Sequence, residues 1–480
     1  MKTNRRGILR RSALAAGGML AAAGCDAQQG PAHSEARPAG ASAKLPVLAE
    51  ADVVVCGGGT AGISAAWAAA RHGAKVVLIE RWPSLGGMAT NALVNIWHTS
   101  DRKKQVIFGF VQQAIERGGE FVRRFPDFPR KPETHDFDCE GMRVVFWRML
   151  QDAGVRVICN LTAVESICRD GRILGVAVDT KRGRRAVMGR MVIDATGDGD
   201  VAANAGLPFE LGRPGDARVQ GMTMMFCLRD IDHAALRQAG TKKANEVLAK
   251  MKILRDQGKF PPFNEGAAGH YLRTGPMHVP YNMCPATCNP LDEEELTRAS
   301  ARAREQVFEY LALWRKEMPG FAKARVTHMG FGIGVRESRR VKGLKQLTAQ
   351  MVVKAVKQSD AVGHGFWMID IHDPMGSGHT TWTDQKPETM PPVGESYHVP
   401  LGMCLNAAVP NLAVVGRCAW ATHEATASVR LQSHCMVMGQ GVGTAAALAL
   451  EGGVDMARVD VKKLQATLRK DGAYIEDVPT

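Results

Sequence analysis

Six residues near the start of the chain have the types and spacing that bind a pyrophosphate. The segment 57–62 reads GGGTAG and matches the pattern GxGxxG at Gly57, Gly59 and Gly62. The first glycine permits a tight turn, the second lets the backbone approach a phosphate, and the third lets a helix pack closely on a strand. Further along, the carboxylate of Glu80 can accept hydrogen bonds from ribose hydroxyls. These residues predict a dinucleotide site; the alternative is a glycine-rich turn in another kind of α/β protein.

Two strands and a helix are expected to position these residues. Residues 52–56 are a short apolar run, 63–72 have a helical pattern, and 75–79 are a second apolar run that ends at Glu80. Continuous apolar runs of this length are typical of buried parallel strands. The unit is about 30 residues long, as a βαβ nucleotide-binding unit requires.

Three later segments carry further glycine motifs. The pair Gly86-Gly87 follows the acid, the triplet 195–197 (ATG) follows an apolar strand at 191–194, and Gly416 ends another apolar strand at 411–415. A helix is expected over 435–450, where small residues let backbones approach closely.

Together, these segments resemble the FAD-dependent oxidoreductase family, which has the glutathione-reductase-type FAD fold and is related to the fumarate reductase and heterodisulfide reductase flavoproteins. The resemblance covers about residues 50–450, and its matching segments are 86–90, 193–200, 334–340 and 416–418. It implies an α/β fold, with a discontinuous Rossmann-like FAD-binding domain and an inserted α+β cap domain. The FAD ligands that it implies are Gly57, Gly59, Gly62, Glu80, Arg81, Gly87, Thr90, Ala195, Thr196, Gly197, Gly416, Arg417 and Gly443. The backbone at Ala163, within a strand pair expected over 156–168, is assigned to the adenine.

The resemblance also implies an order of domains along the chain. The FAD-binding domain is expected to comprise residues 50–217 and 400–452. Residues 218–399 would form the cap and substrate domain, with a long amphipathic helix over 291–316. Residues 453–480 would form a tail with a short helix.

The N-terminus has the features of an export signal. Arg5-Arg6 precede an apolar stretch over 12–24 that is too short to span a bilayer. Residues 4–9 resemble a twin-arginine signal, and the alternative is an ordinary secretion signal. Residues 22–25 resemble a lipoprotein cleavage box, which makes Cys25 a candidate for lipidation; cleavage without an anchor is the alternative. The signal would comprise residues 1–25, a flexible tether 26–49, and the protein is expected to be periplasmic or otherwise exported.

Composition and charge exclude several classes of function. The net charge is +13, of which five charges lie in the first 24 residues, and the chain lacks basic runs interleaved with aromatic residues. Nucleic acid is therefore not an expected partner. The sequence shows no set of metal ligands and no hydrolase or NTPase motif. Cys284 and Cys288 are spaced so that a disulfide is conceivable.

Candidate catalytic residues are the histidines and arginines near the expected flavin face. They are His98, Arg336, His372, His398, His423 and Arg430. Hydride removal from a hydroxyl or amine carbon needs a base, and reduction of an activated double bond needs a proton donor and an anion clamp. The leading hypothesis is hydride transfer to or from a small polar substrate outside the cytoplasm. The alternatives are fumarate-reductase-like reduction and a flavin-bearing redox or binding protein without turnover. The electron partner and the oligomeric state stay open.

Overall fold

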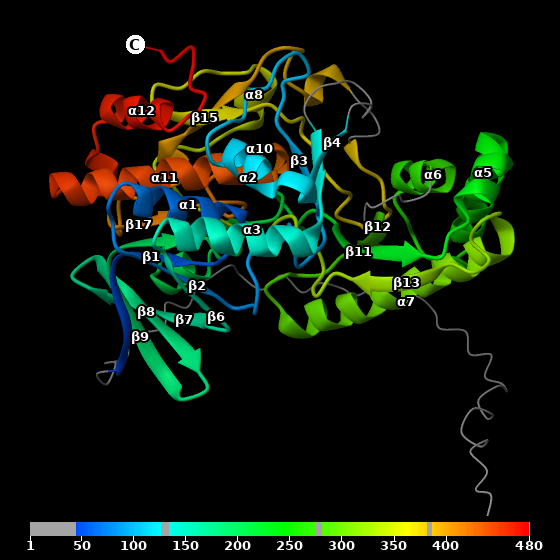
Figure 1. The fold of residues 1–480 in the computed structure, drawn as a ribbon, viewed down its shortest axis with the longest axis horizontal. Helices are drawn as coiled ribbons and strands as arrows, with labels where there is room; N and C mark the ends of the chain where they lie inside the picture. Colours follow the sequence, from blue (N-terminus) through cyan, green and yellow to red (C-terminus); the bar gives the residue numbers. More distant parts are fainter. Residues whose placement is uncertain (1–44, 126–133, 275–280, 382–385, 480) are drawn as a thin grey trace, which may run out of the picture. The chain divides into compact units, whose positions relative to one another are not determined.

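A seven-stranded sheet contains the strand that leads into the Gly57 motif (Figure 1). Five strands run parallel in the order β6-β2-β1-β9-β17, and β8 and β7 continue the sheet antiparallel beside β9. The strands are β1 Val47–Cys56, β2 Val76–Glu80, β6 Arg156–Cys159, β7 Thr162–Arg169, β8 Arg172–Thr180, β9 Gly183–Asp194 and β17 Leu412–Val414. The computed structural model describes residues 45–125, 134–274, 281–381 and 386–479, so the export signal, Cys25 and most of the tether lie outside the described residues.

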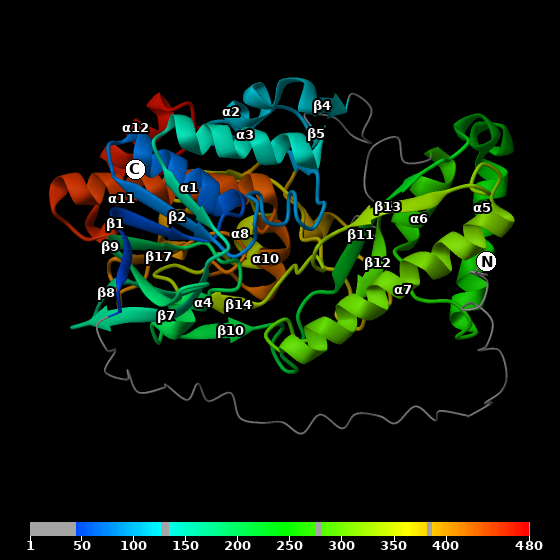
Figure 2. The ribbon, with the colours of Figure 1, turned by 60° about the horizontal axis from the view of Figure 1, so that its bottom comes forward.

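Helices cover one face of this sheet, whose central strands are buried. β2 is buried along its whole length, and β1 is buried over its last four residues. The helices α1 (Thr60–Arg71), α3 (Cys139–Asp152) and α11 (Gln432–Gly452) lie on the same face (Figures 1 and 2). Parallel sheets need such cover, since neither face can meet water. The predicted α/β class with a Rossmann-like sheet is confirmed.

Strand β9 has two different neighbours along one edge. Its first part pairs antiparallel with β8, from Thr180 opposite Gly183 to Gly175 opposite Met188. Its last three residues pair in parallel with β17. A strand from near the C-terminus therefore completes a sheet that otherwise consists of residues 47–194.

A second region has its own sheet and its own hydrophobic core. The antiparallel sheet β12-β11-β13 lies beside three helices (Figure 2). Its elements are β11 Met222–Arg229, α5 His233–Asp256, α6 Glu265–Thr274, β12 Tyr281–Ala286, α7 Glu293–Glu317 and β13 Arg325–Met329. Its core consists of buried residues from Val219 to Ile333, with Tyr281 and Trp314 fully buried. Here α7 corresponds to the helix expected over 291–316.

The segment between this second region and β17 does not belong to the second core but packs against the seven-stranded sheet and its helices. Leu347, Val352, Tyr397 and Val399 belong to the core that also contains β1 and α1. The core of the expected cap therefore ends near residue 333.

The remaining elements are β3 Ile96–His98, α2 Phe110–Gly118, β4 Val122–Phe125, β5 Thr134–Phe137, α4 Asp200–Asn204, β10 Phe209–Leu211, β14 Arg339–Val341, α8 Ala349–Val353, β15 Ala361–Gly365, β16 Tyr397–Pro400, α10 His423–Val429 and α12 Val461–Lys470.

The strands expected over 156–168 do form, but they do not pair with each other. β6 pairs with β2, whereas β7 pairs with β8 at the other edge of the sheet. Between them, the N–H of Leu161 donates to the carbonyl of Glu80 over 2.9 Å. This hydrogen bond holds the chain next to the end of β2, so Ala163 lies close to Glu80.

Two further observations concern the cysteines and the membrane. The thiol of Cys284 lies 2.8 Å from Oε1 of Gln306, and that of Cys288 lies 3.7 Å from Sδ of Met222, so the two are not joined in a disulfide. In the part of the chain that the structure describes, no helix is long and apolar enough to cross a membrane.

Candidate functional site

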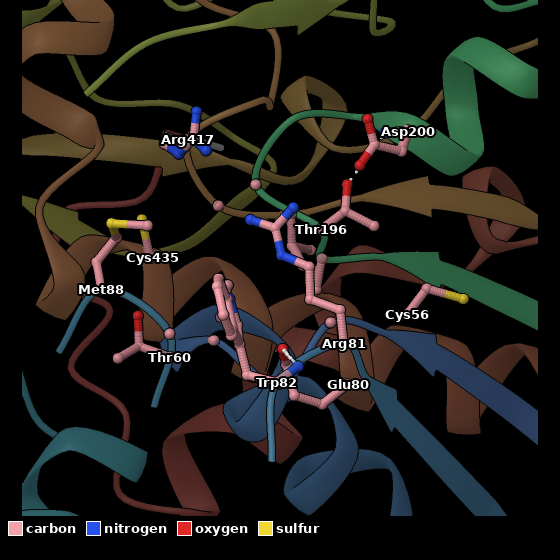
Figure 3. A pocket seen from close by; sticks show the side chains of 18 of the residues that line it. Cys56, Thr60, Glu80, Arg81, Trp82, Met88, Thr196, Asp200, Arg417 and Cys435 are labelled. Carbon is pink, nitrogen blue, oxygen red and sulfur yellow. Dashed lines mark hydrogen bonds between the residues drawn. The ribbon is translucent and has the colours of Figure 1, made fainter. Parts of the chain in front are cut away.

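A cavity opens where the parallel strands β1, β2, β9 and β17 end. Eleven of the fourteen predicted cofactor residues line it: Gly57, Gly59, Glu80, Arg81, Gly87, Ala163, Ala195, Thr196, Gly197, Gly416 and Arg417. Ligands of open α/β sheets bind at this edge, because loops from several strands meet there. Figure 3 shows side chains from these loops around one space.

Glycine backbones line one part of the cavity, which we call the glycine end (Gly57, Gly59 and Gly87, with Gly62 packed against Gly57). Gly57 has a φ of +113°, and a Cβ there would lie 2.3 Å from the carbonyl oxygen of Ala195. A Cβ on Gly87 would lie 2.8 Å from Cα of Gly59, so two glycine loops touch. Gly62 does not line the cavity, but a Cβ there would lie 1.9 Å from the carbonyl oxygen of Gly57. The first turn of α1 therefore approaches the end of β1 as closely as the motif predicts.

Glu80 is buried and held by backbone donors. Its Oε1 accepts a hydrogen bond of 2.8 Å from the N–H of Trp82, and its Oε2 accepts from the N–H of Gly58. Burial raises the pKa of Glu80. The carboxylate is thus fixed beside the glycine turn with lone pairs left for ribose hydroxyls.

Acidic side chains shape the turn after β9. Both oxygens of Asp194 accept hydrogen bonds, of 2.7 Å from Oγ1 of Thr196 and of 2.8 Å from the N–H of Ala202. Arg417, which follows β17, donates to Asp198 over 2.6 Å. Burial by itself would raise the pKa of Asp198, but the charge of Arg417 lowers it. This ion pair joins the ends of β9 and β17.

Two predicted cofactor residues pack elsewhere. Oγ1 of Thr90 donates to the carbonyl of Leu85 over 2.6 Å, and Thr90 fills the space beneath Gly86. A Cβ on Gly443 would lie 2.2 Å from the carbonyl oxygen of Ala65, so this glycine lets α11 pack against α1. Thr90 stabilises a loop and Gly443 a helix contact, and neither lines the cavity.

Several lining residues were not predicted. The additional side chains include Trp82, Met88, Asp200, Gln432 and Cys435. Met88 and Cys435 lie next to each other on one side of the cavity, with Trp82 nearby (Figure 3). Trp82 and Met88 adjoin predicted residues in the chain. Gln432 and Cys435 stand in the first turn of α11, a helix that was expected from residue 435, but neither side chain was named as a site residue.

The cavity also meets a group of charged side chains, which we call the charged end (Arg336, Asp370, His372 and Arg430). Arg430 lines the cavity. Its Nη2 lies 3.0 Å from the carbonyl oxygen and 3.8 Å from Oδ2 of Asp370. Nε2 of His372 lies 3.6 Å from the same Oδ2. Asp370, which was not a predicted site residue, therefore joins two predicted ones.

Residues 220 and 221 bring Arg336 to the same group. Arg336 donates to the carbonyl of Gly221 over 2.7 Å, and the N–H of Gly221 donates to the carbonyl of His372 over 2.9 Å. Nε of Arg430 donates to Oε1 of Gln220 over 3.3 Å. The four side chains thus come from three separated segments of the chain.

The pKa values at the charged end reflect burial and mutual charge. Burial and the nearby Arg430 lower the pKa of Arg336 to about 9. Burial and Arg336 lower the pKa of His372 to about 4. Burial would raise the pKa of Asp370, but His372, Arg430 and Arg336 lower it to about 2. At neutral pH the aspartate is therefore charged, and His372 is neutral and able to accept a proton.

His98 and His423 lie beside the charged end without belonging to it. The ring of His98 stacks on Trp367 at 4.3 Å. Burial lowers the pKa of His98 to about 4, against the attraction of Asp370. Nδ1 of His423 lies 2.8 Å from Oε2 of Glu337, a buried carboxylate that also pairs with Arg340.

His398 has a different place from the one predicted. Its Nδ1 accepts from the N–H of Gln358 over 2.9 Å, and its Nε2 bonds the carbonyl of Glu476 over 2.8 Å. Both ring nitrogens are therefore used by the backbone, and the residue does not line the cavity. This geometry gives His398 a part in holding the C-terminal tail.

The cavity fits a flavin dinucleotide in its parts. The glycine turn at the start of α1 suits a pyrophosphate, because its N–H groups and helix dipole attract anions. A fixed carboxylate suits a ribose, and apolar side chains such as Met88 and Leu161 suit planar rings.

Comparison with known proteins agrees with this geometry. The sequence profile of the family described as FAD dependent oxidoreductase matches residues 52–468. Digeranylgeranylglycerophospholipid reductase 1 of Methanopyrus kandleri is 31% identical over 169 residues, which are 33% of this chain and 43% of the relative. Thiamine thiazole synthase of Methanococcus aeolicus is 28% identical over 165 residues, which are 32% of this chain and 57% of the relative. The chain thus aligns with less than two thirds of either relative.

Among solved structures, a geranylgeranyl bacteriochlorophyll reductase-like protein from Thermoplasma acidophilum matches with a TM-score of 0.42 and 14% identity, over 88% of this chain and 84% of that one. The quinol fumarate reductase of E. coli matches with a TM-score of 0.38 and 13% identity, over 88% and 74%. Since the family profile covers most of the sequence, the chain belongs to the FAD dependent oxidoreductase family and uses FAD as its cofactor.

Proposed function

We propose that this enzyme transfers a hydride between FAD and a small polar substrate, with the reacting carbon held where the cavity meets the charged end. The observation that carries the proposal is the position of Arg430, which lines the cavity and also contacts Asp370. FAD, when bound, supplies the acceptor or donor of the hydride. The predicted ligands that line the cavity would hold it.

The side chains of this protein would manage the proton. A neutral His372 takes the proton of a substrate hydroxyl or amine at Nε2. Asp370, at 3.6 Å, stabilises the imidazolium that results. Arg336 and Arg430 orient the substrate. In the opposite direction, the same histidine returns the proton.

Anaerobic mixing of the oxidised holoenzyme with a panel of sugars, hydroxy acids and amines tests this proposal. A substrate should bleach the flavin absorbance. His372→Gln should slow the bleaching by on the order of a hundredfold while FAD stays bound. The matched control is His328→Gln on β13, an exposed histidine, which should leave the rate unchanged.

Other outcomes decide against the proposal. If no compound of the panel bleaches the flavin, but fumarate-like acceptors reoxidise the chemically reduced enzyme, reduction of an activated double bond replaces it. An unchanged rate in His372→Gln removes the proton-accepting role of His372.

We further propose that the enzyme acts outside the cytoplasm. Arg5-Arg6 and the apolar stretch 12–24 support an export signal that accepts a protein already folded around its cofactor. Cell fractionation tests this: changing both arginines to lysine should retain the protein in the cytoplasm. Cys25→Ala should release it from the membrane fraction if Cys25 carries a lipid, and should leave its fractionation unchanged if it does not.

A further inference from the structure

The charged end contains one more positive than negative charge. Arg336 and Arg430 are cations, Asp370 is an anion, and His372 is neutral near pH 7. Glu337, a buried carboxylate whose charge also acts on Arg430, is already paired with Arg340 and contacts His423. Buried charges are costly unless they are compensated, so the group requires one further negative charge.

The two guanidinium groups are held by neighbouring residues, and the charge of Arg430 acts on Arg336. Both are tied to residues 220 and 221, through Gln220 on one side and Gly221 on the other. Both arginines keep some access to solvent, since Arg336 is partly buried and the side chain of Arg430 is 14% exposed. The side chains of Asp370 and His372 are 16% and 13% exposed. A small ligand can therefore reach them beside the cavity.

One atom in the group has no partner. Oδ1 of Asp370 is buried and makes no hydrogen bond within the described residues. A carboxylate oxygen accepts hydrogen bonds only, so a ligand with a hydroxyl or amino group would satisfy it. Arg336 already donates from Nη1 to Gly221 and Thr223 and from Nη2 to Asn282, and Arg430 donates from Nε to Gln220 and from Nη2 to Asp370. Nε of Arg336 and Nη1 of Arg430 are the donors that contacts among the described residues leave for a carboxylate.

From these observations we infer that the substrate is a small monocarboxylic acid that carries a hydroxyl or amino group near its carboxylate. The carboxylate lies between Arg336 and Arg430, and the hydroxyl or amino group lies beside Asp370 and His372, which are 3.6 Å apart. A dicarboxylate is disfavoured because the group compensates only one negative charge. The inference rests on the proposed function and assigns the substrate class of that same site.

Calorimetric titration of the holoenzyme tests this class without requiring turnover. The probes are lactate and alanine as monocarboxylates, malate as a dicarboxylate, and 1,2-propanediol as a neutral compound. We expect a monocarboxylate to bind at least about tenfold more tightly than malate and the diol. Equal binding of the diol, tighter binding of malate, or no binding of either monocarboxylate would overturn the inference.

Substitutions at Arg336 and Asp370 test whether the charges of these side chains determine which acid binds. Arg336→Gln should weaken binding of the monocarboxylate by about tenfold or more, and Arg336→Lys, which keeps the charge, by less. Asp370→Asn should shift the preference toward malate, because the group then has two uncompensated cations. The control is Arg325→Gln on β13, whose side chain is 65% exposed and pairs with Asp230. Unchanged preference in both Arg336→Gln and Asp370→Asn contradicts the inference.

The visible absorbance of bound FAD keeps the two proposals apart. If the yellow protein binds monocarboxylates but is not bleached by them, the charged end does bind such acids, and hydride transfer from them is contradicted. A protein that is bleached by sugars and does not bind acids contradicts the substrate class and leaves the proposed function in place.

Discussion

The glycine end and the charged end of the site are built in opposite ways. The glycine end consists of backbone, and its shape depends on the absence of side chains at Gly57, Gly62 and Gly87. The charged end consists of side chains that meet from three segments of the chain. The first end presents a fixed surface suited to a phosphate, whereas the second presents charges and a proton acceptor. One site can thus bind a common cofactor rigidly and still differ between relatives in what it recognises.

The largest expected effect is at the glycine end. Gly62→Ala places a Cβ 1.9 Å from the carbonyl oxygen of Gly57, so α1 and β1 must move apart and the pyrophosphate turn is lost. We expect purified protein without bound FAD, measured by its visible absorbance. The matched control is Gly452→Ala at the end of α11, where a Cβ meets only Val454 at 3.7 Å. Normal FAD content in Gly62→Ala would show that this close contact is dispensable.

A smaller loss is expected from the ion pair that joins β9 to β17. Arg417→Ala leaves Asp198 without its cation, which should lower the free energy of unfolding by about 3 kcal/mol. Chemical denaturation measures the change. Adding Asp198→Asn should recover part of the loss, because the remaining side chain is then uncharged. An unchanged free energy of unfolding in Arg417→Ala would show that this ion pair contributes little to stability.

His398 provides a test of which histidines belong to the charged end. His398→Ala removes two hydrogen bonds to the backbone and should lower the free energy of unfolding by about 2 kcal/mol. Turnover and FAD content should stay unchanged below the unfolding temperature. A large loss of turnover in the folded variant would return His398 to the site.

The effect on the pH dependence of stability is a balance of shifts that oppose each other. Burial lowers the pKa of His98 and His372 from 6.5 to about 4. Between these values the unfolded chain binds more protons than the folded chain, so the free energy of unfolding falls as the pH falls through this window. Near the glycine end, burial raises the pKa of Asp194 from 3.8 to about 6, which has the opposite sign.

Thermal unfolding between pH 7 and pH 4.5 measures this dependence. From the two histidines we expect a decrease in Tm of a few °C as the medium is acidified. The double variant His98→Gln with His372→Gln should show a smaller decrease than the wild type. An equal decrease in both proteins would mean that these histidines do not titrate as their burial indicates.

The same contrast explains how far the sequence could predict the site. Gly57, Gly59 and Gly62 stand within six residues, so a local pattern contains the whole turn. Asp370 was not assigned to the site, because its partners Arg336 and Arg430 are distant in sequence and meet it only through the tertiary fold. One local signal was present: Asp370 and His372 alternate, and alternate residues of an extended segment point to the same side.

Glycine patterns also have more than one meaning. Gly443 was expected at the flavin, but it serves the packing of α11 on α1. A pattern of small residues in a helix indicates close approach without showing what approaches. In the same way, the pattern 57–62 predicted an element order that the sheet confirms, whereas the pairing of 156–168 depended on strand neighbours that no local pattern contains.

The divided edge of β9 has a consequence for the timing of synthesis. β17 follows β9 only after the whole intervening region has been made, and Gly416 and Arg417 follow β17. While the ribosome is still translating that region, the nascent chain has the glycine turn but lacks this wall of the cavity. The cofactor can therefore be enclosed only after most of the polypeptide has emerged, and a chain that stops before residue 412 should be released without it.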